Sequence, residues 1–140
     1  MKFLHNLIRL AKWRLDERRQ AVADLEGERR QLLDGIAELE ARSDEESRVA
    51  ATAGDVLFVF PAYRAAQVAK VAALEESVSD VDDRLEEAHE ALRGAFREVK
   101  KLELSLEAHQ RRAQAEADRR DQIALDEMAL DGFRRRPANN

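Results

Sequence analysis

Apolar residues recur along most of this 140-residue chain at alternating spacings of three and four positions, in two separate arms. In the first arm the series is Leu4, Ile8, Ala11, Leu15, Val22, Leu25, Leu32, Ile36 and Leu39. In the second arm it is Val71, Leu74, Val78, Val81, Leu85, Ala88, Leu92, Ala95, Val99, Leu102 and Leu106. A mean spacing near 3.5 keeps one narrow stripe facing a partner helix over many turns, as in a coiled coil. The pattern therefore predicts an all-α fold with little room for a buried catalytic cleft.

A short break separates the two arms. Gly54 suits the C-terminus of one helix, and Pro61 suits the first turn of the next, where its missing N–H costs little. We therefore expect a first helix over about residues 2–51, a tip over about 52–60 and a second helix over about 61–136. Together they are expected to form a single coiled-coil domain over residues 1–140.

The unequal lengths of the arms favour an antiparallel hairpin. With a tip near residues 55–60, residue i pairs with about residue 115 − i, so the first arm ends opposite about residue 112. The series of the second arm becomes polar at this place, with His109, Ala113, Glu116 and Arg120. Two parallel straight helices would keep their apolar seam. We therefore predict a long two-helix antiparallel coiled-coil hairpin with a longer C-terminal helix, monomeric when free.

Charge is abundant and unevenly placed. The net charge of −5 argues against a general nucleic-acid binder, which needs a basic surface. Residues 1–20 carry six Lys or Arg and two acidic residues, whereas residues 24–46 carry nine acidic residues and three Arg. Residues 75–90 carry eight acidic residues and one Arg. An antiparallel hairpin brings these two acidic blocks together.

The residues that usually carry chemistry are few. The chain has no cysteine and no glycine-rich phosphate loop, and its three histidines lack a His partner at helical spacing. Glu86 and His89 have the spacing of half a di-iron site, but the second pair that such a site needs is missing. We therefore expect no enzyme activity, no metal, no cofactor and no small-molecule substrate.

Two groups of apolar residues lie outside the seam. The first surrounds most of the C-terminal helix and consists of Ile123, Leu125, Met128, Leu130 and Phe133. Such a helix is costly in water unless another protein surrounds it, and the alternatives are a frayed tail or a tail-to-tail dimer. The second group is a stripe beside basic residues, Phe3, Leu7, Leu10 and Trp13. It suits a partner helix or groove, a third helix or a membrane surface.

The expected tip is unusually apolar. Residues 56–60 form an apolar run that includes Phe58 and Phe60, and Tyr63 follows. These side chains either form a contact surface for a partner or fold back to cap the hairpin.

The end of the chain resembles a known family. The segment Asp121-Gln122-Ile123-Ala124-Leu125-Asp126-Glu127-Met128-Ala129, after a charged run over residues 100–112, is similar to the end of the second helix in FliJ proteins. These proteins form the stalk of the bacterial flagellar type III export ATPase. The chain departs from the family at Asp121, where Glu is usual, and at Ile123, where a basic residue is usual.

This resemblance implies a non-enzymatic stalk and adaptor in flagellum biogenesis and motility. In the family, the terminal end of the hairpin inserts into a hexameric export ATPase, and the protein links that ATPase to the export gate and to export chaperones. It implies a cytoplasmic location, at the cytoplasmic face of the inner membrane. The residues that it assigns to the ATPase are Phe3, Leu7, Leu10, Trp13, Gln122, Asp126, Glu127, Met128, Phe133, Arg134 and Arg135. At the tip, Phe58, Phe60 and Tyr63 are assigned to the export gate.

Three other functions are compatible with the residues. The first is that of the equivalent stalk of a virulence type III secretion system, which is similar in shape and role. From another class, a dimeric coiled-coil spacer would show the same apolar periodicity without an ATPase partner. A membrane-surface protein anchored by residues 1–15 would account for the basic, apolar start.

Overall fold

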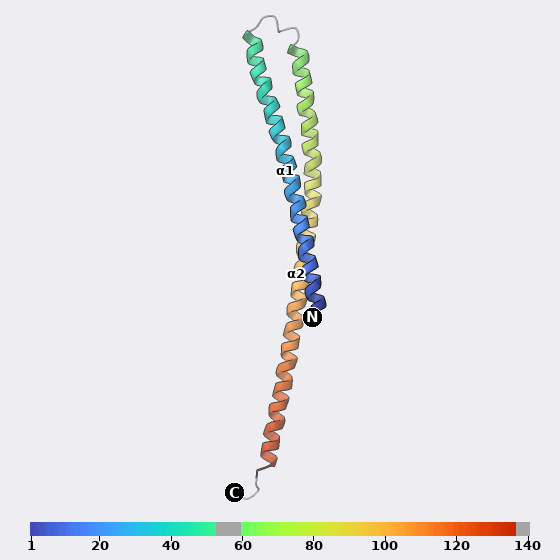
Figure 1. Ribbon diagram of the computed structural model, residues 1–140, viewed down its shortest axis with the longest axis vertical. Coiled ribbons are helices and arrows are strands. Elements are labelled where there is room, and N and C mark those ends of the chain that lie inside the picture. Colours follow the sequence, from blue (N-terminus) through green and yellow to red (C-terminus); the bar gives the residue numbers. More distant parts are fainter. Residues whose placement is uncertain (53–59, 137–140) are drawn as a thin grey trace. The chain divides into compact units, whose positions relative to one another are not determined.

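The described part of the chain consists of two long α-helices. The computed structural model describes residues 1–52 and 60–136, of which Phe60 is described by its backbone alone. Helix α1 spans Lys2–Thr52 and helix α2 spans Phe60–Arg134, and these residues contain no strand (Figure 1). The predicted all-α fold is confirmed. Neither helix contains, within the described residues, an apolar stretch that is long enough to span a membrane.

The chain divides into two compact units, and both helices contribute to each. The hairpin unit is Lys12–Phe96, and the terminal unit combines Met1–Ala11 with Arg97–Asn140. The expectation that residues 1–140 form a single domain stays a prediction.

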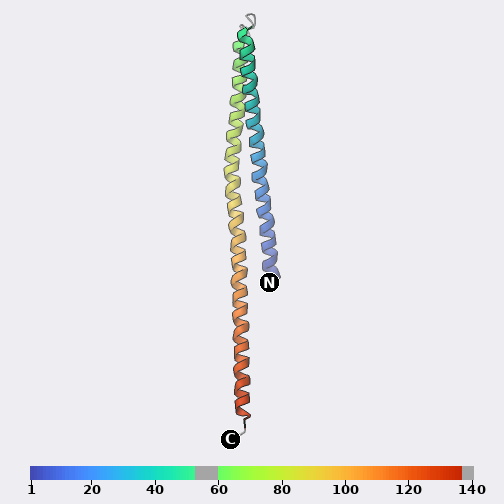
Figure 2. The same cartoon turned by 90° about the vertical axis from the view of Figure 1, so that its left-hand side faces the viewer.

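Within the hairpin unit, α1 and α2 run antiparallel and pack along the predicted seam (Figures 1 and 2). Val22, Val81 and Leu85 form the buried core, and Val81 is only 1% exposed. Four partly buried apolar residues pack against this core: Leu25, Leu32, Ala88 and Leu92. All seven belong to the series read from the sequence, so the antiparallel coiled-coil hairpin is confirmed.

Two reciprocal ion pairs fix the register of the hairpin. The Arg29 Nε donates to the Asp82 Oδ1 at 2.7 Å, and the Arg84 Nη2 donates to the Glu28 Oε1 at 3.0 Å. The residue numbers of the two pairs add up to 111 and 112. The predicted sum of about 115 is therefore wrong by roughly one helical turn. The reason is the position of the helix ends, because Thr52 and Phe60 also add up to 112.

In the terminal unit, the side chains of α2 stop being buried well before the helix ends. Ile8 and Ala11 of α1 and Val99 of α2 are buried, and Leu102, Leu106 and Ala108 are half-buried. From His109 to Arg136 every residue is exposed except the half-buried Glu116. The predicted loss of the apolar seam near residue 109 is therefore seen within this unit, and more than 20 residues of α2 continue beyond it.

Candidate partner-binding surfaces

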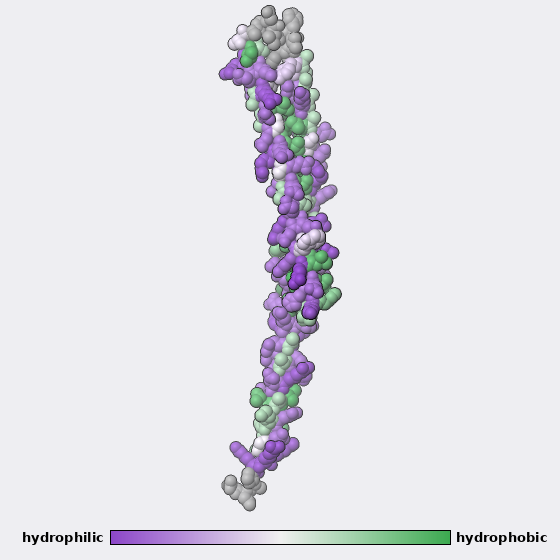
Figure 3. Space-filling model, in the orientation of Figure 1, coloured by the Kyte–Doolittle hydropathy of each residue, from purple (hydrophilic) through white to green (hydrophobic). Residues whose placement is uncertain are grey.

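The C-terminal part of α2 carries a band of exposed apolar side chains. We call Ile123, Leu125, Met128, Leu130 and Phe133 the apolar tail. Phe133 is 73% exposed and Met128 is 69% exposed, although both side chains are large. Figure 3 shows apolar surface on this part of the helix between hydrophilic stretches. Since isolated exposed residues are ordinary but a contiguous group is not, this band is a candidate contact surface.

Polar residues assigned to the ATPase lie among the apolar tail. Gln122, Asp126 and Glu127 are exposed on α2, and the Gln122 Nε2 donates to the Asp126 Oδ1 at 3.1 Å, one helical turn away. Arg134 is the last residue of α2. The Arg135 backbone N–H still donates to the Asp131 carbonyl oxygen at 3.0 Å, so hydrogen bonding of helical type extends past that end. Both arginines are exposed and add positive charge beside Phe133.

The N-terminal stripe is exposed as well. In the terminal unit, Phe3 is 77% exposed, Leu10 is exposed and Leu7 is half-buried. Trp13 is exposed but belongs to the hairpin unit. Leu104 of α2 is a further exposed apolar residue of the terminal unit, and the sequence analysis does not predict it as a site residue. The signal that could have identified it is that this leucine lies outside the apolar series of the seam.

Of the three residues assigned to the tip, the structure describes the side chain of Tyr63 alone. Phe58 lies outside the described residues, and so does the side chain of Phe60. Tyr63 is half-buried, and the Glu46 carboxylate of α1 interacts with its hydroxyl. Hydrogen bonding to this carboxylate is the main cause that raises the pKa of Tyr63 above 10.0, because it stabilises the neutral phenol. Desolvation and the negative charge of Glu46 act in the same direction.

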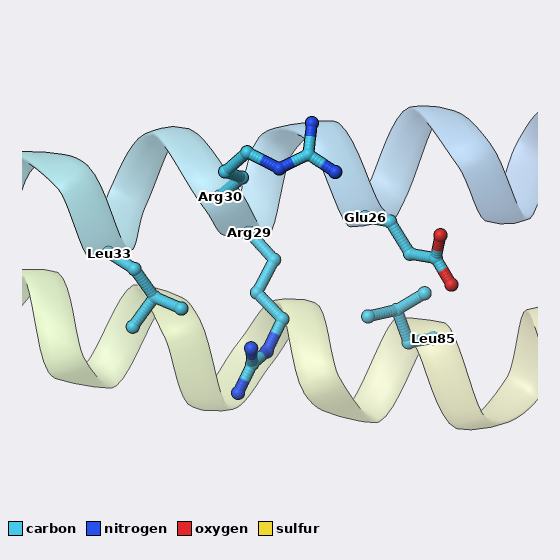
Figure 4. Close-up of a pocket in the computed structure, with 5 residues that line it drawn as sticks. All are labelled: Glu26, Arg29, Arg30, Leu33 and Leu85. Atoms are coloured by element: carbon cyan, nitrogen blue, oxygen red, sulfur yellow. The ribbon is translucent and has the colours of Figure 1, made fainter.

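Grooves along the hairpin unit are lined by seam and flank residues. Figure 4 shows one between α1 and α2, lined by Glu26, Arg29, Arg30, Leu33 and Leu85. In that view the Arg29 side chain crosses toward α2, where it binds Asp82, and the Arg30 guanidinium lies along α1. Among the described residues, no group of three or more His, Asp or Glu side chains is arranged to hold a metal ion.

The comparison with protein families decides the relationship. A family model described as flagellar FliJ protein matches residues 1–138. The chain belongs to the FliJ family. Neither the comparison with curated proteins nor the comparison with solved structures found a match. FliJ proteins are structural components of the flagellar protein export apparatus, so this chain takes part in flagellar protein export.

The family match covers both helices and both candidate surfaces. It includes the apolar tail and the N-terminal stripe, as well as the hairpin unit with Tyr63. The geometry separates these surfaces into two groups. Most of the residues assigned to the ATPase belong to the terminal unit, whereas Tyr63, assigned to the gate, belongs to the hairpin unit.

Proposed function

We propose that this FliJ-family chain is a non-enzymatic stalk that inserts its terminal end into a hexameric flagellar export ATPase. The observation that carries the proposal is the exposed apolar tail on a part of α2 whose seam has already ended. Burying such side chains in a surrounding protein gains roughly 1.5–3 kcal/mol for each large one. A ring of subunits around a central hole offers contacts to several sides of one helix at once.

The remaining residues assigned to the ATPase extend this surface. Phe3, Leu7 and Leu10 supply apolar area in the same unit, and Trp13 follows in α1. The polar residues Gln122, Asp126 and Glu127 supply acceptors and charge for orientation on the ring. Arg134 and Arg135 offer paired guanidinium groups to carboxylates of the ATPase.

In this proposal the hairpin unit reaches the membrane export gate and the export chaperones. Phe58, Phe60 and Tyr63 are the gate-binding residues. A groove close to Tyr63 supports this role, since Gln67, one helical turn after Tyr63 on α2, lines the groove. Its floor includes Leu39 and Val71, which are apolar. The protein then acts at the cytoplasmic face of the inner membrane.

Substitutions in the apolar tail test the proposal. We expect Leu125→Glu with Met128→Glu to weaken binding of the purified export ATPase by about tenfold or more, because two apolar contacts are replaced by charge. Stimulation of ATP hydrolysis should fall in parallel. Truncation after Asp118 should abolish both. The readouts are retention of the ATPase on immobilised protein and its rate of phosphate release.

Val49→Glu is the matched control. Val49 is also an exposed apolar residue, but it lies in the hairpin unit. It should leave ATPase binding unchanged. If the chain truncated after Asp118 still bound the ATPase and stimulated hydrolysis fully, insertion of the tail into the ring would be wrong.

A further inference from the structure

The seam of the hairpin unit becomes polar and small-sided in the last turns of α1 before residue 53. We call residues 43–52 of α1 and 61–71 of α2 the polar end. Its α1 seam positions are Ser43, Ser47 and Ala50, and on α2 Tyr63 and Gln67 face them. Ala50 and Gln67 are buried and the others are half-buried. Small and polar side chains bury little apolar area, so this end contributes less hydrophobic stabilisation than the core at Val81.

Gln67 is buried without full hydrogen bonding. Its side chain is 8% exposed, and its Oε1 has no hydrogen-bond partner among the described residues. A buried amide oxygen without a donor loses its hydration and gains nothing in return. Opening of the two helices at this point would let water bond to that oxygen. The closed state therefore carries a local cost that opening removes.

Packing beside Gln67 is incomplete. The groove of about 280 Å³ adjoins it and is open to solvent, and Leu39, Ser43 and Val71 are among its lining residues. Side chains that border the groove make no contacts with protein atoms on that side. The exposed Val68 lies at the same groove, so its apolar side chain is not used to close the seam.

Charge does not compensate for the poor packing. The ion pairs Glu38–Arg42 and Glu45–Arg48 are contacts between neighbours within α1. Among the described residues of the polar end, no ion pair joins α1 to α2. Across the helices, the Glu46 carboxylate interacts with the Tyr63 hydroxyl.

We propose that the polar end opens and closes as one unit while the rest of the hairpin unit stays closed. Local opening of a protein occurs where few apolar contacts must be broken, and it does not require global unfolding. The apolar core at Val22, Val81 and Leu85 holds the remainder together, and the two cross-helix ion pairs lie beside it. Each opening hydrates Gln67 and frees Tyr63 from Glu46.

Amide hydrogen exchange of the full chain without partners tests this inference. In the unsubstituted protein, amides of residues 43–50 and 64–71 should exchange at least about tenfold faster than those of residues 20–36 and 78–92. Gln67→Leu should slow exchange about tenfold in the polar end alone, because it removes the unpartnered oxygen and adds apolar contact at the seam. Tenfold corresponds to about 1.4 kcal/mol in the opening equilibrium.

Two further variants complete the design. Tyr63→Phe removes the hydroxyl that interacts with Glu46 and should speed exchange in the polar end alone, which gives a second result if Gln67→Leu does not fold. Gln31→Leu, an identical change at an exposed position of α1, should leave exchange in the polar end unchanged. Uniform protection along the hairpin unit would overturn the inference, and so would equal slowing of both regions by Gln67→Leu. Neither result depends on an ATPase.

Discussion

At the scale of single residues, Tyr63 connects the helices through a titratable group. Hydrogen bonding to the Glu46 carboxylate, desolvation and the charge of Glu46 raise the pKa of Tyr63. Gln67 and Arg42 act in the opposite direction, and their effect is smaller. Since a raised pKa means that folding favours the protonated phenol, the stabilisation is present below pH 10 and disappears as the pH rises through the folded-state value.

A pH titration of tyrosine absorbance therefore has a definite expected outcome. Tyr63 is the only tyrosine, so the change in absorbance near 295 nm reports this residue alone. We expect a midpoint above 10.0 in the unsubstituted protein and a shift back toward 10.0 in Glu46→Ala. Glu45→Ala serves as control, because Glu45 pairs with Arg48 instead. An unchanged midpoint in Glu46→Ala would show that the bond to Glu46 does not govern the titration.

Residues of the seam differ in how well the sequence predicts them. Val22, Val81 and Leu85 were predicted because each is apolar and falls into the series of three and four. Gln67 and Ala50 were missed, although both are buried, because the apolar series stops at Leu39 and resumes at Val71. Small and polar residues give no hydropathy signal even where helix geometry carries them into the interface. The polar end became visible only with the structure.

At the scale of the helices, the hairpin unit brings like charges together. The block over residues 24–46 of α1 and the block over residues 75–90 of α2 are both strongly acidic. The observed register, with residue numbers adding up to about 112, places much of one block opposite the other. The two cross-helix ion pairs offset part of this repulsion, but their side chains are 41–54% exposed and are screened by water.

Salt should therefore stabilise the hairpin unit. Raising NaCl from 0.01 M to 0.15 M shortens the screening length from about 30 Å to about 8 Å. We expect the midpoint of thermal unfolding, followed by circular dichroism, to rise by about 2–5 °C. Glu86→Gln with Glu87→Gln should raise the unfolding midpoint at low salt and reduce the further rise that added salt produces. Asp131→Asn, in the terminal unit, should change neither. A midpoint that falls with salt would mean that the ion pairs outweigh the repulsion.

The order and kind of the helices were predictable, whereas their register was not. Apolar periodicity decides that two helices pack side by side, and Gly54 and Pro61 mark the break between them. The register depends on where each helix ends, and a shift of a few residues leaves the periodicity intact. Arg29 and Asp82 show this, because either residue alone looks like a solvated surface charge. Exposure of the apolar tail was predictable, because Ile123, Leu125, Met128, Leu130 and Phe133 point to several sides of one helix.

At the scale of the whole molecule, one chain supplies both sides of the apolar seam. The side chains that a parallel dimer would pair with a second copy are already packed between α1 and α2 of one chain, around Val22, Val81 and Leu85. The acidic blocks would also repel the corresponding blocks of a second copy at low salt. The apolar tail and the N-terminal stripe are exposed surfaces that a second copy could bury. We therefore expect a monomer in solution, in contrast to a dimeric spacer.

Sedimentation equilibrium distinguishes these states directly. The expected mass is 15.9 kDa for the monomer, at micromolar concentration and at both low and moderate salt. Leu125→Glu with Met128→Glu is the informative companion variant. If the unsubstituted protein had twice the monomer mass and this variant had the monomer mass, the tail would be a self-association surface, and its proposed role in the ATPase ring would lose its main support. A dimer that persisted in the variant would instead indicate pairing through the seam or through the N-terminal stripe. A monomeric mass would give the clearest support for a role in the ATPase ring. In a monomer, the helix that carries Met128 and Phe133 leaves its apolar surface available to a different protein.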